Sequence, residues 1–190
     1  DEVARAILTA RGSPAIPFIR VPDATEGDIQ KATDIGALGI IVPMVETAEK
    51  MRAAVRFARF PPAGRRSSGN NQARLLWRDD YRRTCNENLV VVAMIETPEG
   101  VAAADEISSV EGVDVVFAAS GDLKSFTGLA EGHPDYEALV ARIRDAALGA
   151  GKRLGGPLAW RNRPGFTFFQ GPAEATLIQS AAEALSLPGR

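Results

Sequence analysis

The amino-acid sequence predicts an α/β fold in which parallel strands alternate with helices. Short apolar runs rich in Val and Ile recur along the 190-residue chain, and such runs are typical of strands buried on both faces of a parallel sheet. Segments with helical spacing of apolar residues lie between them, and no long linker or low-complexity tract interrupts the alternation. We therefore expect a single (β/α) domain over residues 1–190.

The first half of the chain supplies two strands and four helices. Amphipathic spacing predicts the helices, and short apolar runs predict the strands. A polar loop rich in Pro, Gly and Arg separates the third and fourth helices at residues 61–71. The expected order is a helix over residues 1–11, a strand over 14–21, a helix over 26–35, a strand over 37–44, a helix over 47–60 and a helix over 77–88.

The middle of the chain carries a pair of acidic residues, each at the end of an apolar run. Glu96 ends the run that begins at Val90, and Asp122 ends the run that begins at Val113. Residues 97–100 provide a helix cap, a first-turn proline and a first-turn acid, so a helix over 101–110 should link the two strands. A right-handed crossover makes such strands parallel and brings both acids to one edge of the sheet. Two carboxylates there suit a hard divalent cation.

Each acid also has a purely structural interpretation. Glu96 could be a favourable charge at a helix start, and Asp122 could cap the turn that follows it. For either residue alone the structural interpretation is preferred. Their equivalent positions in successive strand–helix units favour the metal site instead.

The last part of the chain continues the same alternation. A helix over 135–150 ends at Gly151, strands are expected over 153–159 and 166–170, and a final helix over 172–185. The total is six strands, whereas a closed (β/α)8 barrel requires two more and typically about 250 residues. The chain also opens without Met, inside an expected helix. We therefore expect the domain to be N-terminally incomplete, with its first two strands missing from this chain.

Composition argues for a small-molecule role. The chain has 22 basic and 24 acidic residues, so it provides no strong field for nucleic acid or an anionic membrane, and it contains no long apolar span. Its single cysteine, Cys85, excludes an internal disulfide and favours a reducing, cytoplasmic location. The single histidine, His133, precedes a helix and is expected to serve the helix entry rather than catalysis.

Several motifs, taken in order, resemble the HpcH/HpaI aldolase and citrate lyase family, the metal-dependent class II pyruvate aldolases. Each motif is modest alone, but their order and spacing along nearly the whole chain make the resemblance specific. The motifs are Phe18-Ile19-Arg20-Val21-Pro22, residues 34–43, Pro61-Pro62-Ala63-Gly64-Arg65-Arg66, Ile95-Glu96-Thr97, and Gly112-Val113-Asp114 running into Asp122-Leu123.

The resemblance implies a (β/α)8 TIM barrel and a role for each site residue. Glu96 and Asp122 would bind Mg²⁺ or another divalent cation such as Mn²⁺ or Co²⁺, and Arg66 would lie beside the bound 2-oxo acid as a catalytic and substrate-binding residue. Backbone N–H groups near Ser120, Gly121 and Asp122 would hold the substrate carboxylate. Without the resemblance, Arg66 would be interpreted as solvated charge in a polar loop.

Three features depart from the family pattern. Residues 119–124 read Ala-Ser-Gly-Asp-Leu-Lys where the family usually has Gly-Pro-Ala-Asp-Leu-Ser. Met94 replaces a Gln that many family aldolases have two residues before the metal-binding Glu. The family's Asp-x-Glu-His segment, which supplies the acid–base histidine, has no counterpart in this chain and would belong to an earlier strand.

These observations leave three functional hypotheses. The first is a carbon–carbon lyase that reversibly cleaves a 4-hydroxy-2-oxo acid to pyruvate, or a related 2-oxo acid, and an aldehyde through a metal-stabilised enolate. The second is a citrate-lyase-like or citrate-synthase-like enzyme acting on an acyl thioester or oxaloacetate. The third is a non-catalytic barrel subunit. In every case the resemblance implies a homo-oligomer, with the hexameric trimer of dimers as the arrangement of relatives.

Overall fold

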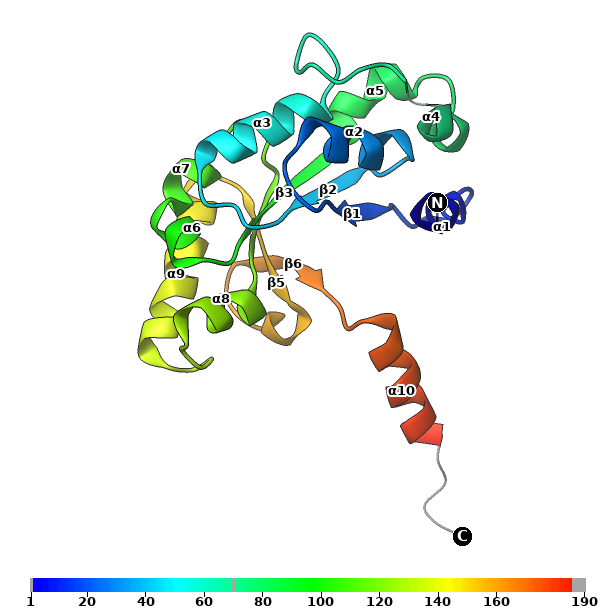
Figure 1. The fold of residues 1–190 in the computed structure, drawn as a ribbon. Coiled ribbons are helices and arrows are strands. Elements are labelled where there is room, and N and C mark those ends of the chain that lie inside the picture. The colour runs from blue at the N-terminus through cyan, green and yellow to red at the C-terminus, as the bar shows by residue number, and fades with distance from the viewer. Residues whose placement is uncertain (1, 70, 186–190) are drawn as a thin grey trace.

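The computed structural model describes residues 2–69 and 71–185, and its centre is a parallel sheet of six strands (Figure 1). The strands lie in the order of the sequence, and each pairs in parallel with the next. Their bounds are β1 Phe18–Arg20, β2 Gly39–Val42, β3 Val90–Ile95, β4 Val115–Ala118, β5 Arg153–Pro157 and β6 Phe166–Gln170.

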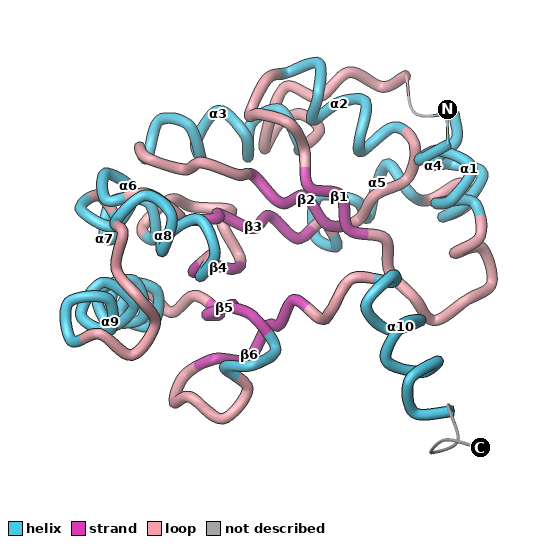
Figure 2. The backbone as a smooth tube through the Cα atoms, turned by 60° about the horizontal axis from the view of Figure 1, so that its bottom comes forward, coloured by secondary structure: helices cyan, strands magenta, loops and turns pink. Residues whose placement is uncertain are grey.

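The sheet curls into a half-barrel whose convex side is covered by helices (Figure 2). The helices in chain order are α1 Glu2–Leu8, α2 Glu26–Asp34, α3 Ala48–Ala58, α4 Asn71–Trp77, α5 Tyr81–Asn88, α6 Pro98–Ala102, α7 Ala104–Ser108, α8 Ser120–Thr127, α9 Pro134–Gly149, the 3₁₀-helix η1 Leu158–Trp160 and α10 Glu174–Leu185. The main core fills the space between the sheet and helices α2 to α9. A smaller apolar cluster around Val92, Met94, Val115 and Phe117 lines the other, concave side.

Local sequence signals set the starts of the helices near the sheet edge. The side chains of Thr25, Thr47 and Thr97 cap α2, α3 and α6, each accepting a hydrogen bond from the backbone N–H three residues later. The His133 side chain caps α9 by accepting a hydrogen bond from the backbone N–H of Asp135, two residues later, which agrees with the helix-entry role that the sequence predicts. The Thr97 cap fixes where the loop after β3 ends, and therefore where the residues after β3 lie.

The structure corrects the expected lengths of several elements. The strand expected over 14–21 is only three residues long, because Pro14 and Pro17 cannot donate ladder hydrogen bonds. The helix expected over 77–88 is shortened to α5, which begins at Tyr81. A further helix, α4, precedes it, and residues 78–80, including Arg78 with φ of +72°, separate the two. The helix expected over 101–110 is two short helices, α6 and α7.

The closed barrel expected from the resemblance is not formed by the described residues. They supply six strands in one open sheet whose end strands, β1 and β6, do not pair with each other. The final helix forms as predicted, but α10 stands away from the sheet and contains no buried residue (Figure 1). Within residues 2–69 and 71–185, α10 therefore buries none of its side chains against the half-barrel.

Candidate active site

Glu96 and Asp122 meet at the carboxyl-terminal edge of the sheet. Glu96 directly follows β3, and Asp122 lies in the first turn of α8, which begins two residues after β4. Strands β3 and β4 are paired in parallel, with Ile95 opposite Ala118. Both acids line one cavity of about 420 Å³. The convergence that the sequence predicts for this pair is therefore present.

The Glu96 carboxylate is buried, with 2% of the residue exposed to solvent. Its Oε1 accepts a hydrogen bond of 2.5 Å from the backbone N–H of Met44, which follows β2. Burial raises the pKa of Glu96 above its ordinary value, and the nearby Asp122 raises it further, while the Met44 N–H and the charge of Arg20 act in the opposite direction. A bound cation would relieve the repulsion between the two carboxylates.

Met44 is a site residue that sequence reasoning missed. Its φ of +50° is in the left-handed region, which is unusual for a residue with a side chain. In this conformation the backbone N–H of Met44 donates its hydrogen bond to the Glu96 carboxylate. The sequence carries no signal for it, because Met is not a residue type that favours positive φ.

The donor set fits a hard divalent cation. Two carboxylates offer oxygen ligands, and Mg²⁺ is commonly held by one or two carboxylates with water and substrate completing the coordination. No cluster of three or more His, Cys, Asp or Glu side chains suited to a metal ion occurs in the described part of the chain. A soft, closed site of the zinc-finger type is therefore not formed by these residues.

A second cavity, of about 310 Å³, adjoins the first through two shared residues, Asp122 and Arg20. Ser120 and Gly121 line it, together with Met94 and Phe117 from the concave face. No side chain caps the start of α8, and a Cβ placed on Gly121 would meet no atom within 4 Å. The first turn of α8 therefore combines unpaired backbone donors with open space, which suits an anion.

The start of α8 is anchored by a residue from the next helix. The hydroxyl of Tyr136, in α9, donates a 3.1 Å hydrogen bond to the carbonyl of Ser120. Tyr136 is fully buried, and burial raises the pKa of its hydroxyl to about 12. This long-range contact fixes the first turn of α8, which carries Ser120 to Asp122, and sequence spacing alone gives no indication of it.

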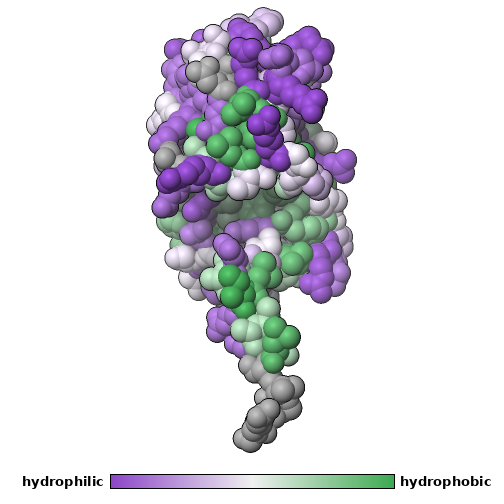
Figure 3. Space-filling view, turned by 90° about the vertical axis from the view of Figure 1, so that its right-hand side faces the viewer, coloured by the Kyte–Doolittle hydropathy of each residue, from purple (hydrophilic) through white to green (hydrophobic). Residues whose placement is uncertain are grey.

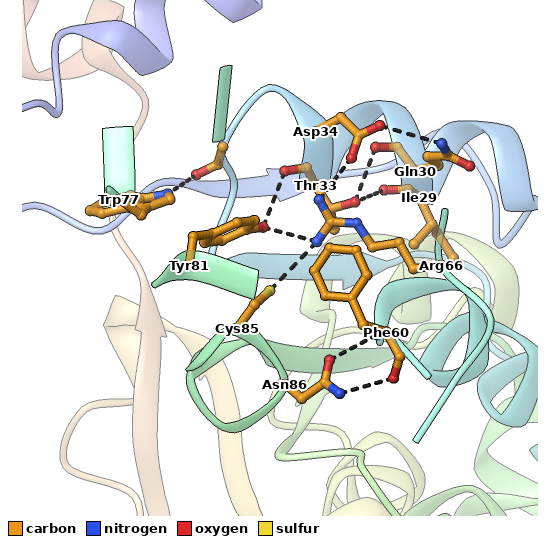
Figure 4. A network of polar contacts seen from close by, with 11 residues as sticks. Ile29, Gln30, Thr33, Asp34, Phe60, Arg66, Trp77, Tyr81, Cys85 and Asn86 are labelled. Atoms are coloured by element: carbon orange, nitrogen blue, oxygen red, sulfur yellow. Dashed lines mark hydrogen bonds and ion pairs between the residues drawn. The ribbon is translucent and has the colours of Figure 1, made fainter. Parts of the chain in front are cut away.

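Arg66 lies in a separate, buried cluster (Figure 4). Its guanidinium forms a 2.7 Å ion pair with Asp34 and donates a 2.9 Å hydrogen bond to the Tyr81 hydroxyl. It also donates to the Cys85 sulfur at 3.5 Å, and its centre lies 4.5 Å from the centre of the Phe60 ring.

The cluster holds Arg66 as a charged group. Burial by itself lowers the pKa of Arg66, but Tyr81 and Asp34 outweigh it and the net pKa is raised. The Nε atom is buried without a hydrogen-bond partner among the described residues. Arg66 does not line the cavity that Glu96 and Asp122 share. A role beside a substrate therefore stays a prediction, and it requires the side chain to leave this cluster.

Similarity to known proteins supports the family assignment made from the motifs. The sequence model of the HpcH/HpaI aldolase/citrate lyase family matches residues 2–158. The chain therefore belongs to this family.

Individual relatives give the same assignment. The chain is 41% identical to a hydroxypyruvate/pyruvate aldolase from Delftia acidovorans, in an alignment covering 73% of this chain and 54% of the relative. It is 34% identical to a hydroxypyruvate/pyruvate aldolase from Rhizorhabdus wittichii, in an alignment covering 95% of this chain and 76% of that relative. The crystal structure of the citrate synthase SbnG superposes with a TM-score of 0.80 at 30% identity, covering 97% of this chain and 76% of that one. The chain thus spans between about half and three quarters of the length of these proteins.

The helices are also informative about membranes. Within residues 2–69 and 71–185, none combines the length and the apolar character that crossing a bilayer requires.

Proposed function

We propose that the protein is a divalent-metal-dependent class II aldolase, a lyase that cleaves a 4-hydroxy-2-oxo acid to pyruvate, or a related 2-oxo acid, and an aldehyde. The observation that carries this proposal is the convergence of Glu96 and Asp122 in one cavity at the carboxyl edge of the sheet. Membership of the HpcH/HpaI family and similarity to aldolases that act on hydroxypyruvate and pyruvate support it.

Glu96 and Asp122 are the proposed metal ligands, and Mg²⁺ or Mn²⁺ suits their oxygen atoms. A bound metal supplies Lewis-acid stabilisation of the enolate that forms when the carbon–carbon bond breaks. Met44 fixes the Glu96 carboxylate through its N–H, and Asp122 extends from the first turn of α8.

The substrate carboxylate is proposed to bind at the first turn of α8, at Ser120, Gly121 and Asp122. The absence of a side-chain cap there and the open space beside Gly121 support this assignment. Arg66 is retained as a predicted substrate-binding and catalytic residue on the basis of its motif alone.

The experiment is a condensation assay. Protein with Mg²⁺ or Mn²⁺ is incubated with pyruvate and a panel of aldehydes, and products are followed by mass spectrometry. Glu96→Gln and Asp122→Asn should each reduce product formation at least about 100-fold, because each removes a charged ligand from a two-carboxylate site. Arg153→Met, at the amino end of β5, is a control that should leave it unchanged. Product that forms equally without metal would contradict the proposal. A lack of product with every aldehyde would also contradict it and would favour a non-catalytic barrel subunit.

A second candidate is a citrate-lyase-like or citrate-synthase-like enzyme acting on oxaloacetate or an acyl thioester. The altered loop Ala119-Ser120-Gly121 and the similarity to citrate synthase SbnG favour it. Calorimetry with metal-loaded protein separates the two candidates. Binding of oxaloacetate without binding of pyruvate would support the second, and the reverse would support the aldolase.

We further infer that the whole protein forms a closed (β/α)8 barrel in the cytoplasm and assembles as a homo-oligomer. The apolar side chains on α10 support assembly: Leu177 and Ile178 are more than half exposed, and Figure 3 shows apolar surface over this helix. A second copy is the proposed partner of this face. Sedimentation should show an oligomer that Ile178→Lys weakens; a monomeric wild-type protein would contradict this proposal.

A further inference from the structure

The last strand of the sheet brings one amide side chain to the second cavity. Gln170 ends β6 and lines the 310 Å³ cavity together with Ser120 and Asp122 of α8. It is the only side-chain amide among the described residues that line either cavity. Gln170 also lies beyond residues 2–158, which the family model matches. The match to the family therefore does not account for it.

A β-bulge in β6 turns Gln170 toward this cavity. The pairing of β5 with β6 skips Thr167, which has no partner opposite it. As a result, Phe166 packs in the main core, whereas Phe168 packs against the apolar cluster on the concave side. Residues two apart in a regular strand share a face, so Gln170 lies on the concave side with Phe168 and reaches the cavity. Bulges commonly re-aim side chains beside active sites.

The amide of Gln170 is available to a ligand. Gln170 is exposed, and its side chain has no hydrogen-bond partner within residues 2–69 and 71–185. A primary amide carries two donor hydrogens and an acceptor oxygen. It can therefore accept from a ligand group as well as donate to it. This suits a hydroxyl group, which does both, better than a carboxylate, which only accepts.

The place of Gln170 in the sheet points to the aldehyde half of the substrate. Neighbouring strands lie about 4.8 Å apart, so Gln170 is roughly 10 Å along the sheet from the end of β4, which leads into Asp122. The strand between them, β5, contributes Gly155 and Pro157 to the concave side, and neither has a polar side-chain group. The 2-oxo acid half is proposed to bind beside Glu96 and Asp122. Gln170 is thus the next polar side chain for the part of the substrate that extends past β5.

We propose that Gln170 is a substrate-binding residue for the aldehyde half, and that its amide pairs with a hydroxyl group that the aldehyde carries. The substrate class is then a hydroxyaldehyde rather than an unsubstituted aldehyde. This inference rests on the proposed function and extends it, because the proposed function leaves the aldehyde open.

The test is a competition between isosteric aldehydes. Metal-loaded protein receives pyruvate and equal amounts of two aldehydes, in which a hydroxyl group of one replaces a methyl group of the other, and mass spectrometry gives the product ratio. The pairs are glycolaldehyde with propanal, and 3-hydroxypropanal with butanal. In Gln170→Met the ratio should shift about 3- to 10-fold toward the unsubstituted aldehyde in at least one pair, the loss expected for a neutral hydrogen bond. Gln170→Ala should shift the ratio in the same direction.

Thr167→Val is the matched control on the same strand. Thr167 is exposed and is not among the residues that line the two cavities, so loss of its hydroxyl should leave both product ratios unchanged. Calorimetry should give wild-type affinities for Mn²⁺ and pyruvate in Gln170→Met, because the proposed contact is made only by the aldehyde half.

Three outcomes would overturn the proposal about Gln170 while leaving the aldolase proposal intact. They are wild-type product ratios for both pairs in Gln170→Met, an equal shift in Thr167→Val, and a parallel loss of pyruvate affinity in Gln170→Met. If wild-type protein forms no product with any aldehyde, the proposed function is wrong and the role of Gln170 falls with it.

Discussion

Two arginines of this protein occupy opposite environments. The Arg66 side chain is completely buried and paired with Asp34, Tyr81 and Cys85, whereas the Arg20 side chain is exposed at the cavities with no partner among the described residues. The resemblance assigns a substrate role to Arg66, whereas the arginine that lines the cavities of Glu96 and Asp122 is Arg20. The contrast teaches that an arginine whose charge is already neutralised stabilises the fold, while an arginine without a counter-ion is available to a ligand.

The largest predicted effect comes from removing the buried cation. Arg66→Met should lower the free energy of unfolding by about 3 kcal/mol, because it leaves the Asp34 carboxylate without its partner and removes the contact with the Phe60 ring. This loss is at the lower end of the range usual for breaking a buried ion pair, since the Asp34 side chain is 19% exposed and can be partly hydrated. Urea unfolding followed by circular dichroism measures the change.

Arg65→Met is the matched control for that change. Arg65 is the neighbouring residue, but its guanidinium lies at the surface and pairs with Glu26, so its loss should cost no more than about 0.5 kcal/mol. Equal stability of the Arg66 and Arg65 variants would contradict the view that Arg66 is a structural residue.

A smaller effect is expected from the tyrosine that accepts from Arg66. Tyr81→Phe removes the acceptor of the 2.9 Å hydrogen bond from Nη1 and leaves that nitrogen with only the distant Cys85 sulfur. The free energy of unfolding should fall by about 2 kcal/mol, as is typical for hydrogen bonds to charged groups. In the Arg66→Met variant, Tyr81→Phe should lower the free energy of unfolding much less. If the losses of the two substitutions simply add, Arg66 and Tyr81 are not energetically coupled.

The sequence predicts the fold more completely than the site. The six strands, their order and the convergence of Glu96 and Asp122 follow from apolar runs that end in polar residues. The same rule applies to Arg20, which ends β1, but this strand is only three residues long and Pro14 and Pro17 precede it, so the signal in the sequence is weaker. The contacts of Met44 with Glu96 and of Tyr136 with Ser120 join distant elements and have no local signature.

The Arg66 cluster shows a second feature that the sequence alone does not predict, the burial of a charged side chain. A polar loop that contains two adjacent arginines predicts solvated charge, and that description fits Arg65. Arg66 is instead enclosed because Asp34, at the end of α2, and Tyr81, at the start of α5, approach it from separate elements. Burial of one arginine of a pair depends on tertiary packing, which neighbouring residue types do not encode.

Alkaline pH offers a way to compare the cluster with the site. The chain contains two tyrosines, Tyr81 in the cluster and Tyr136 beside α8. Burial raises the pKa of both above the ordinary value of 10, that of Tyr136 to about 12. A raised folded-state pKa means that the folded protein holds the proton more tightly, so this stability is complete below pH 10 and is lost as the pH rises from 10 toward 12 and beyond.

Each tyrosine can be followed alone. In Tyr81→Phe the absorbance change at 295 nm reports Tyr136, and in Tyr136→Phe it reports Tyr81. We expect both to ionise above pH 10 in the folded protein, Tyr81 at the higher pH. Ionisation of either at its ordinary value before unfolding would show that its hydroxyl is not enclosed as the structure describes.

The smallest predicted change in stability belongs to Arg20. Because its guanidinium has no partner among the described residues, Arg20→Met removes no hydrogen bond or ion pair and should alter the free energy of unfolding by no more than about 0.5 kcal/mol. Without metal the substitution also removes the positive charge that acts on Glu96, so the pKa of Glu96 should rise further in this variant. Urea unfolding at neutral pH measures the first effect. A loss comparable with that of Arg66→Met would mean that Arg20 also serves the fold, and the difference between the two arginines would disappear.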